Sequence, residues 1–145
     1  MSRALQLVLE QRQQAEDDAL KRLAEARQAY AALEHKANTM ASYRDEYLQQ
    51  MSSRAQGGVM AQSLGHYQAF IARLDAGQQE LQQSLAGYRA AMEDRERQWR
   101  QSHQEKRAIE LLLERQHQRQ VQQQARQDQK IADEFSQRRF AVELE

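Results

Sequence analysis

The chain has 145 residues, carries 21 basic and 21 acidic side chains, and contains no proline, no cysteine and five glycines. The balanced charge gives no indication of a nucleic-acid partner, and no apolar run approaches the roughly 20 residues that a membrane-spanning helix needs. Proline costs about 3 kcal/mol inside a helix, so its absence, together with few β-branched residues, predicts an all-α fold of long helices.

The first helix is expected over residues 3–53. A coiled-coil seam has apolar residues at alternating spacings of four and three, and eleven of the fourteen positions that this rule visits from Leu5 are apolar or aromatic. The pattern predicts one narrow contact face on a helix that is otherwise solvated. The seam positions are Leu5, Leu9, Arg12, Glu16, Ala19, Leu23, Ala26, Tyr30, Leu33, Ala37, Met40, Arg44, Tyr47 and Met51.

A turn is expected over residues 54–62. Gly57 and Gly58 are the only adjacent glycines of the chain, and two serines shortly precede them. Glycine costs roughly 1 kcal/mol relative to alanine inside a helix. The chain is therefore predicted to end its first helix here and to reverse direction.

A second helix is predicted to pair with the first over residues 63–114. Eleven of the fifteen seam positions that start at Leu64 are apolar or aromatic. If Met51 meets Tyr67 beside the turn, facing residues have numbers that add to about 117, and the two seams have matching lengths. This match favours a long two-stranded antiparallel coiled-coil hairpin over a parallel dimer. The positions are Leu64, Tyr67, Ile71, Leu74, Gln78, Leu81, Leu85, Tyr88, Met92, Arg95, Trp99, Ser102, Lys106, Ile109 and Leu113.

Four charged residues occupy seam positions, namely Arg12, Glu16, Arg95 and Lys106. Their aliphatic stems are expected to lie along the seam while their charged groups reach water. The alternative is that a polar seam residue fixes the register of the two helices.

Residues 115–140 are expected to form a projecting helix or a flexible arm. Between residues 114 and 130 only Val121 and Ala125 are apolar, so the segment keeps helix-forming residues but lacks a seam. Spaced apolar residues on a projecting arm are typical of a partner-binding segment, whereas a disordered tail is the alternative. The apolar side chains that return near the end of the chain are Ile131, Phe135, Phe140, Val142 and Leu144.

The sequence offers no catalytic or metal-binding constellation, so we expect neither an enzyme nor a cofactor nor a metal. The four histidines are scattered, without spare carboxylates beside them. Glu114-x-x-His117 is a single copy of a motif that a di-iron site in a helical bundle uses twice. Phosphate-binding glycine loops and the zinc-protease motif are missing. Residues 115–139 are only mildly basic, which favours a solvated helix face over a nucleic-acid-binding arm.

Aromatic residues gather on both sides of the predicted turn. Tyr47, Tyr67 and Ile71 take seam positions, which leaves Tyr43 and Phe70 at the edge of the seam. Aromatic residues at such an edge can be ordinary packing residues. A partly exposed patch of Tyr and Phe is also typical of a protein-binding site, because these rings supply a large contact area at low entropic cost.

Several features, in this order, resemble the flagellar type III export protein FliJ family across nearly the whole chain. They are an N-terminal heptad helix, Tyr43-Arg-Asp-Glu-Tyr47, a glycine-containing break, Tyr67-Gln-Ala-Phe70-Ile71-x-x-Leu74, a tryptophan in the second helix, Leu113-Glu-Arg115, and Asp128-Gln-Lys-x-x-Asp-Glu-Phe135. The ordered combination is more specific than any one of these motifs.

The resemblance implies an antiparallel coiled coil similar to the central stalk of rotary ATPases. Such a protein is a soluble component of the flagellar type III export apparatus, which serves motility and chemotaxis. It promotes assembly and activity of the export ATPase ring, a FliI-like hexamer, contacts a FlhA-like export-gate protein, and takes part in handling export chaperones. We therefore expect a cytoplasmic protein that associates peripherally with the inner membrane, without direct membrane insertion and without nucleic acid.

The resemblance also implies two binding surfaces. Export-gate binding carries over to Met40, Tyr43, Tyr47, Phe70 and Leu74. Two further positions of that surface are Lys36 and Gly77 here, so the match is partial. ATPase-ring binding is expected where the start of the chain meets the late second helix, at Leu5, Leu9, Arg12, Ile109 and Leu113.

Two other functions fit the same sequence pattern. The equivalent stalk protein of a virulence type III secretion system shares the architecture. A structural coiled-coil spacer would use its aromatic residues only for packing, would dimerise through the same seam and would show no preference for an ATPase ring. A cytoplasmic location is expected in each case, because the chain start lacks the pattern of a signal peptide and the chain lacks cysteine.

Overall fold

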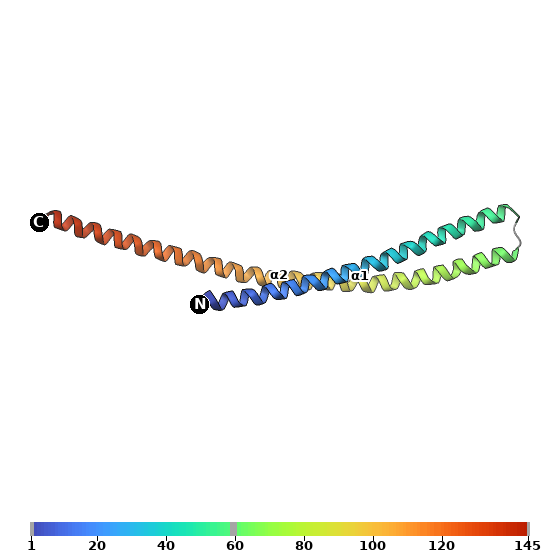
Figure 1. Ribbon diagram of the computed structural model, residues 1–145, viewed down its shortest axis with the longest axis horizontal. Helices are drawn as coiled ribbons and strands as arrows, with labels where there is room; N and C mark the ends of the chain where they lie inside the picture. The colour runs from blue at the N-terminus through green and yellow to red at the C-terminus, as the bar shows by residue number, and fades with distance from the viewer. Residues whose placement is uncertain (1, 59–60, 145) are drawn as a thin grey trace. The chain divides into compact units, whose positions relative to one another are not determined.

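The computed structural model describes residues 2–58 and 61–144. These residues form two helices, α1 (Ser2–Gln56) and α2 (Ala61–Leu144), and none of them belongs to a strand. The two helices run antiparallel and pack against each other as a hairpin (Figure 1). The predicted all-α coiled-coil hairpin is thereby confirmed.

The length of the helices follows from composition. α1 has 55 residues and α2 has 84, far above the usual helix of about 10 to 14 residues. Long helices of this kind need sequences without proline and rich in Ala, Leu, Gln, Glu and Arg, which lose little side-chain freedom in a helix. Their stability then depends on the face that the two helices share.

α1 ends at Gln56, directly before the glycine pair and three residues beyond the end expected from the sequence. Gly57 donates its backbone N–H to the carbonyl oxygens of Ser53 and Arg54, and Gly58 donates to that of Ala55. Gly58 has a φ of 78°, a left-handed conformation that a residue with a Cβ atom rarely adopts. The predicted turn over residues 54–62 includes Val59 and Met60, which lie outside the described residues.

The contacts divide the chain into two compact units. The first contains residues 18–100, with most of α1, the turn and the first part of α2. The second contains the described residues of 1–17 and of 101–145.

The seam of residues 18–100 follows the predicted heptad positions. Ala19, Leu23, Ala37 and Ile71 are buried, and the other predicted seam residues are half-buried, with the exception of Tyr88, which is 46% exposed. A two-stranded seam is only one stripe wide, so few side chains can be enclosed completely. Leu23, at 1% exposed, is the large side chain that the described seam encloses best.

The register of this unit agrees with the prediction that facing residue numbers add to about 117. Arg89 donates a hydrogen bond of 2.7 Å to the Tyr30 hydroxyl, and its guanidinium carbon lies 5.6 Å from the Tyr30 ring centroid. Further towards the turn, Arg44 pairs with Asp75. In each of these two pairs the residue numbers add to 119, close to the predicted value.

The second unit has its own half-buried seam residues, the last of which in α2 is Gln116. Leu5, Leu9, Ile109 and Leu113 are half-buried, whereas Arg12 is exposed and forms an ion pair of 2.9 Å with Glu105. From residue 117 to residue 144 every side chain of α2 is exposed. This last part of α2, orange to red in Figure 1, is a helix with no other helix beside it.

None of the described helices combines the length and apolar character that crossing a membrane would require.

Replacing Leu23 by Ala is expected to lower the free energy of unfolding by about 3 kcal/mol, because it leaves a cavity in the best-enclosed part of the seam. Leu20 is the matched control, since it lies in the same helix and is 46% exposed; its replacement by Ala is expected to cost less than about 1 kcal/mol. Guanidinium unfolding followed by circular dichroism measures both. Equal losses for the two variants would contradict the described seam.

Candidate protein-binding surfaces

The residues that the resemblance assigns to export-gate binding come together near the turn. We call this group, Met40, Tyr43, Tyr47, Phe70 and Leu74, the aromatic surface. Its centre is Tyr47, whose ring centroid lies 4.3 Å from that of Phe70 and 5.9 Å from that of Tyr67. α1 supplies the first three members and α2 the last two, so the surface exists only when the hairpin is folded.

The members of the aromatic surface differ in exposure. Met40, Tyr47 and Leu74 are half-buried in the seam, whereas Tyr43 is 53% and Phe70 is 36% exposed. The prediction that Tyr43 and Phe70 lie at the edge of the seam is confirmed. Phe70 packs on Tyr47 as well as facing solvent, so of these two side chains Tyr43 is the one more available to a partner.

Charged side chains flank the aromatic surface. Arg44 Nε donates a hydrogen bond to Asp75 Oδ1, which links α1 to α2 one residue away from Tyr43 and from Leu74. This hydrogen bond raises the pKa of Arg44. Nearer the turn, the Arg54 guanidinium lies 5.5 Å from the Tyr67 ring centroid. These contacts border the apolar surface with polar groups, as in many protein interfaces.

Gly77, one of the two positions that depart from the family pattern, lies beside the end of the Met40 side chain. A Cβ atom at this position would lie 2.9 Å from Met40 Cε, closer than carbon atoms pack without strain. A larger residue here would make the flexible end of Met40 move. Lys36, the other departure, is exposed.

The residues assigned to ATPase-ring binding also come together, in the second unit. We call Leu5, Leu9, Arg12, Ile109 and Leu113 the open-end surface. Four of them are half-buried seam residues, and Arg12 is exposed at the side of the seam.

Three leucines outside the seam were not predicted for this surface. Leu7 is 53% exposed, Leu111 40% and Leu112 46%. They lie between seam positions of α1 and of α2, and heptad spacing alone therefore assigns them to solvated faces. The sequence signal that could have assigned them to a binding surface is their apolar character, since a solvated helix face does not need leucine.

A buried ion pair lies beside the open-end surface. Glu16 Oε2 is 2.9 Å from Lys106 Nζ and 3.3 Å from His103 Nδ1, and the Glu16 side chain is only 12% exposed. The expectation that the charged groups of Glu16 and Lys106 reach water is therefore wrong, because each meets the other across the seam. His103 thus lies beside a carboxylate that is already paired with Lys106.

The ion pair perturbs both partners. The hydrogen bond from Lys106 lowers the pKa of Glu16 from its usual value of 4.5, against the opposing effect of burial. The same hydrogen bond raises the pKa of Lys106. A charge in a nearly closed seam needs an opposite charge, since an unpaired one would be strongly destabilising.

Within the described residues, no group of three or more potential metal ligands comes together. The surfaces described above can bind through apolar contact, stacking and ion pairing.

The comparison with protein families decides where the chain belongs. The sequence model of the family described as "Flagellar FliJ protein" matches residues 1–145, the whole chain. The chain belongs to this family. The resemblance drawn from the Tyr-x-x-Phe-Ile and Asp-Gln-Lys-x-x-Asp-Glu-Phe motifs is thereby confirmed, and this family member is a coiled-coil protein associated with flagellar export. No curated protein and no solved structure matches the chain.

Replacing Glu16 by Gln is expected to destabilise the protein at pH 7, because Lys106 loses its close partner across the seam and keeps only the more distant Glu110, at 3.9 Å. A glutamate with a lowered folded pKa contributes stability above its unfolded pKa, and that contribution is lost as the pH falls through the folded value. The stability difference between native protein and variant should therefore shrink below about pH 4.5. Guanidinium midpoints measured between pH 7 and pH 3 test this expectation.

The control is Glu25→Gln, at an exposed position of the same helix. This variant should show little difference from the native protein throughout the pH range. A Glu16→Gln difference that stays constant with pH would contradict a role for the carboxylate charge.

Proposed function

We propose that this protein is the stalk-like component of the flagellar export apparatus. In this proposal the open-end surface engages the export ATPase ring and promotes its assembly and activity, and the aromatic surface contacts the export-gate protein. The observation that carries the proposal is the match of the flagellar FliJ family to the whole chain. The protein then acts by binding, without a catalytic activity of its own.

The hairpin is suited to a stalk. Two helices joined by interhelical ion pairs, such as Arg12–Glu105 and Glu16–Lys106, resist sliding along each other better than a seam of purely apolar residues. A ring of ATPase subunits would act on such a rod from its sides. The exposed leucines Leu7, Leu111 and Leu112 offer apolar contacts for a surrounding ring.

The aromatic surface is suited to a separate partner. Tyr43 and Phe70 expose large rings beside the paired Arg44 and Asp75, an arrangement of apolar centre and polar border that protein interfaces share. A plain structural spacer has no need of an exposed tyrosine at this place. The flagellar family also favours the flagellar system over the virulence secretion systems.

Two further parts of the proposal follow from the family alone. They are the handling of export chaperones and a cytoplasmic location at the inner membrane, where the export apparatus is assembled.

Adding the purified chain to its cognate flagellar export ATPase is expected to raise the rate of ATP hydrolysis. Deleting residues 2–10 should abolish the increase, because it removes Leu5 and Leu9 from the open-end surface. Phosphate release measured over a range of chain concentrations gives the effect. Circular dichroism checks that the shortened chain remains helical.

The matched variant for this assay is Tyr43→Ala, which changes the aromatic surface and should stimulate the ATPase as well as the native chain does. If the folded native chain leaves an active ATPase unaffected, the stalk role is wrong.

Tyr43→Ala is expected to weaken binding to the export-gate protein by about tenfold or more, as loss of a central interface aromatic commonly does. Adding Phe70→Ala should weaken it further. Calorimetric titration of the gate protein's soluble part measures both variants. Because Phe70 packs on Tyr47, a thermal melt must accompany the double variant.

The control is Tyr88→Ala, which removes another exposed tyrosine of residues 18–100, 46% exposed and away from the turn. Its binding should equal that of the native chain. Equal losses for Tyr43→Ala and Tyr88→Ala, or an unfolded Tyr43→Ala variant, would make the aromatic residues structural.

A further inference from the structure

The last part of α2 is exposed on all sides, although it carries large apolar side chains. Residues 117–144 have no buried or half-buried side chain, and Ile131, Phe135 and Val142 are 64%, 66% and 72% exposed. A helix without tertiary contacts is marginally stable in water. A partner that covers the apolar residues would therefore stabilise it.

One face of this segment repeats the spacing of a coiled-coil seam. The residues that follow each other at spacings of three and four on this face are Ala125, Asp128, Ala132, Phe135, Arg139 and Val142. Four of the six are apolar, and the two charged members have opposite sign. We call this set the arm face.

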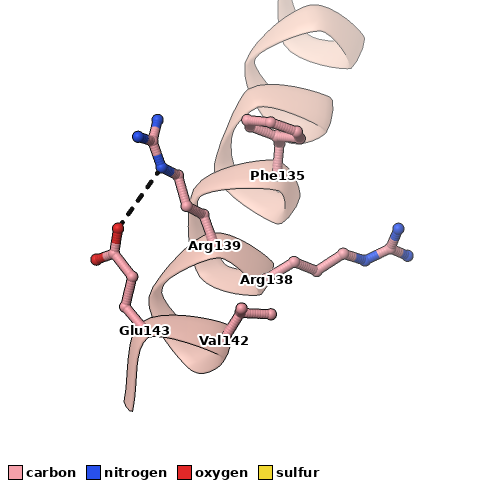
Figure 2. A pocket seen from close by; sticks show the side chains of 5 residues that line it. All are labelled: Phe135, Arg138, Arg139, Val142 and Glu143. Carbon is pink, nitrogen blue, oxygen red and sulfur yellow. Dashed lines mark ion pairs between the residues drawn. The ribbon is translucent and has the colours of Figure 1, made fainter. Parts of the chain in front are cut away.

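Figure 2 shows the end of the arm face. Phe135 and Val142 lie on one side of the helix, between Arg138 and the ion pair of Arg139 with Glu143. The ion pair is 3.7 Å long and both side chains are largely exposed, so it contributes little stability. Arg139 can exchange this partner for another carboxylate without a large loss.

The arm face is complementary to itself. In an antiparallel pair centred between Asp133 and Glu134, each member of the face lies opposite another member of the same face. Asp128 meets Arg139 of the second copy, Ala132 meets Phe135, and Ala125 meets Val142. Opposite charges and small against large side chains thus face each other in one register, which is the pattern of a specific coiled coil.

We propose that residues 125–142 of α2 pair antiparallel with the same residues of a second copy of this chain. The pair buries Phe135 and Val142 of both copies and forms two equivalent ion pairs between Asp128 and Arg139. This is an isologous contact, in which the same surface is used by both copies, as in most two-fold dimers.

The part of α2 that α1 does not cover is long enough for this arrangement. In the proposed register Leu144 of one copy reaches Gln123 of the other. The start of α1 pairs with α2 only as far as the half-buried Gln116, so the second copy finds an unoccupied stretch of helix. Asp133 and Glu134, which would be close to the two-fold axis, lie about 130° around the helix from the arm face and keep their charges in water.

The first test compares two phenylalanines of the same arm. Phe135 lies on the arm face, whereas Phe140 lies about 140° further around the helix, and the two are 66% and 64% exposed. Sedimentation equilibrium of the full chain should show a dimer. Phe135→Ala should raise its dissociation constant by at least about tenfold, since both copies lose a buried ring, while Phe140→Ala should leave it unchanged.

The second test fixes the register through the charges. Asp128→Arg alone and Arg139→Asp alone each place like charges opposite each other and should be monomeric. A mixture of these two variants restores both ion pairs, so it should form mixed dimers, and the double variant should dimerise with itself. Pairing through the α1–α2 seam, or through Phe140, would not give this result.

Two outcomes would overturn the proposal. One is a native chain that remains monomeric at concentrations of about 100 µM. Its affinity for a second copy would then be weaker than that of most specific dimers. The other is a dimer that responds equally to Phe135→Ala and Phe140→Ala, or whose charge variants are not rescued by mixing. Binding of the arm to lipid vesicles with no dimer in solution would assign its apolar side chains to a membrane surface instead.

Discussion

The width of the seam between α1 and α2 is the constraint on which the rest of the molecule depends. Two helices share a single stripe of side chains, and Leu23 is the large residue that the described stripe encloses best. Stability is therefore spread thinly along the hairpin instead of residing in one core. Polar contacts across the seam, such as Tyr30–Arg89 and Arg44–Asp75, gain importance because so little apolar area is available.

The same constraint creates the candidate binding surfaces. A stripe one side chain wide has no room for every aromatic ring near the turn, so Tyr47 occupies the seam and Tyr43 and Phe70 remain at its edge. The exposed leucines of the open end arise in the same way, since Leu7 and Leu111 fall between heptad positions. Large apolar groups that a two-stranded coil leaves outside its seam are available to a partner.

Heptad spacing predicted most of the fold, because each seam position follows from the number of residues per helical turn. The register followed from matching seam lengths and is borne out by contacts such as Arg12–Glu105. Heptad spacing could not predict the ion pair between Glu16 and Lys106, because a long lysine side chain reaches beyond the residue directly opposite it. It also missed the exposure of Tyr88, since nothing in one helix shows how much of the facing helix covers a given position. The binding roles assigned to the two surfaces stay predictions.

The polar seam residues explain why one register is preferred among several that apolar packing alone would allow. Sliding α2 by one heptad keeps apolar residues opposite each other at many positions. It also moves Lys106 away from Glu16 and brings Trp99 or Leu113 to its place. An ionised carboxylate would then be enclosed against apolar groups, at a cost of several kcal/mol. Charged residues in the seam therefore disfavour wrong alignments of the two helices.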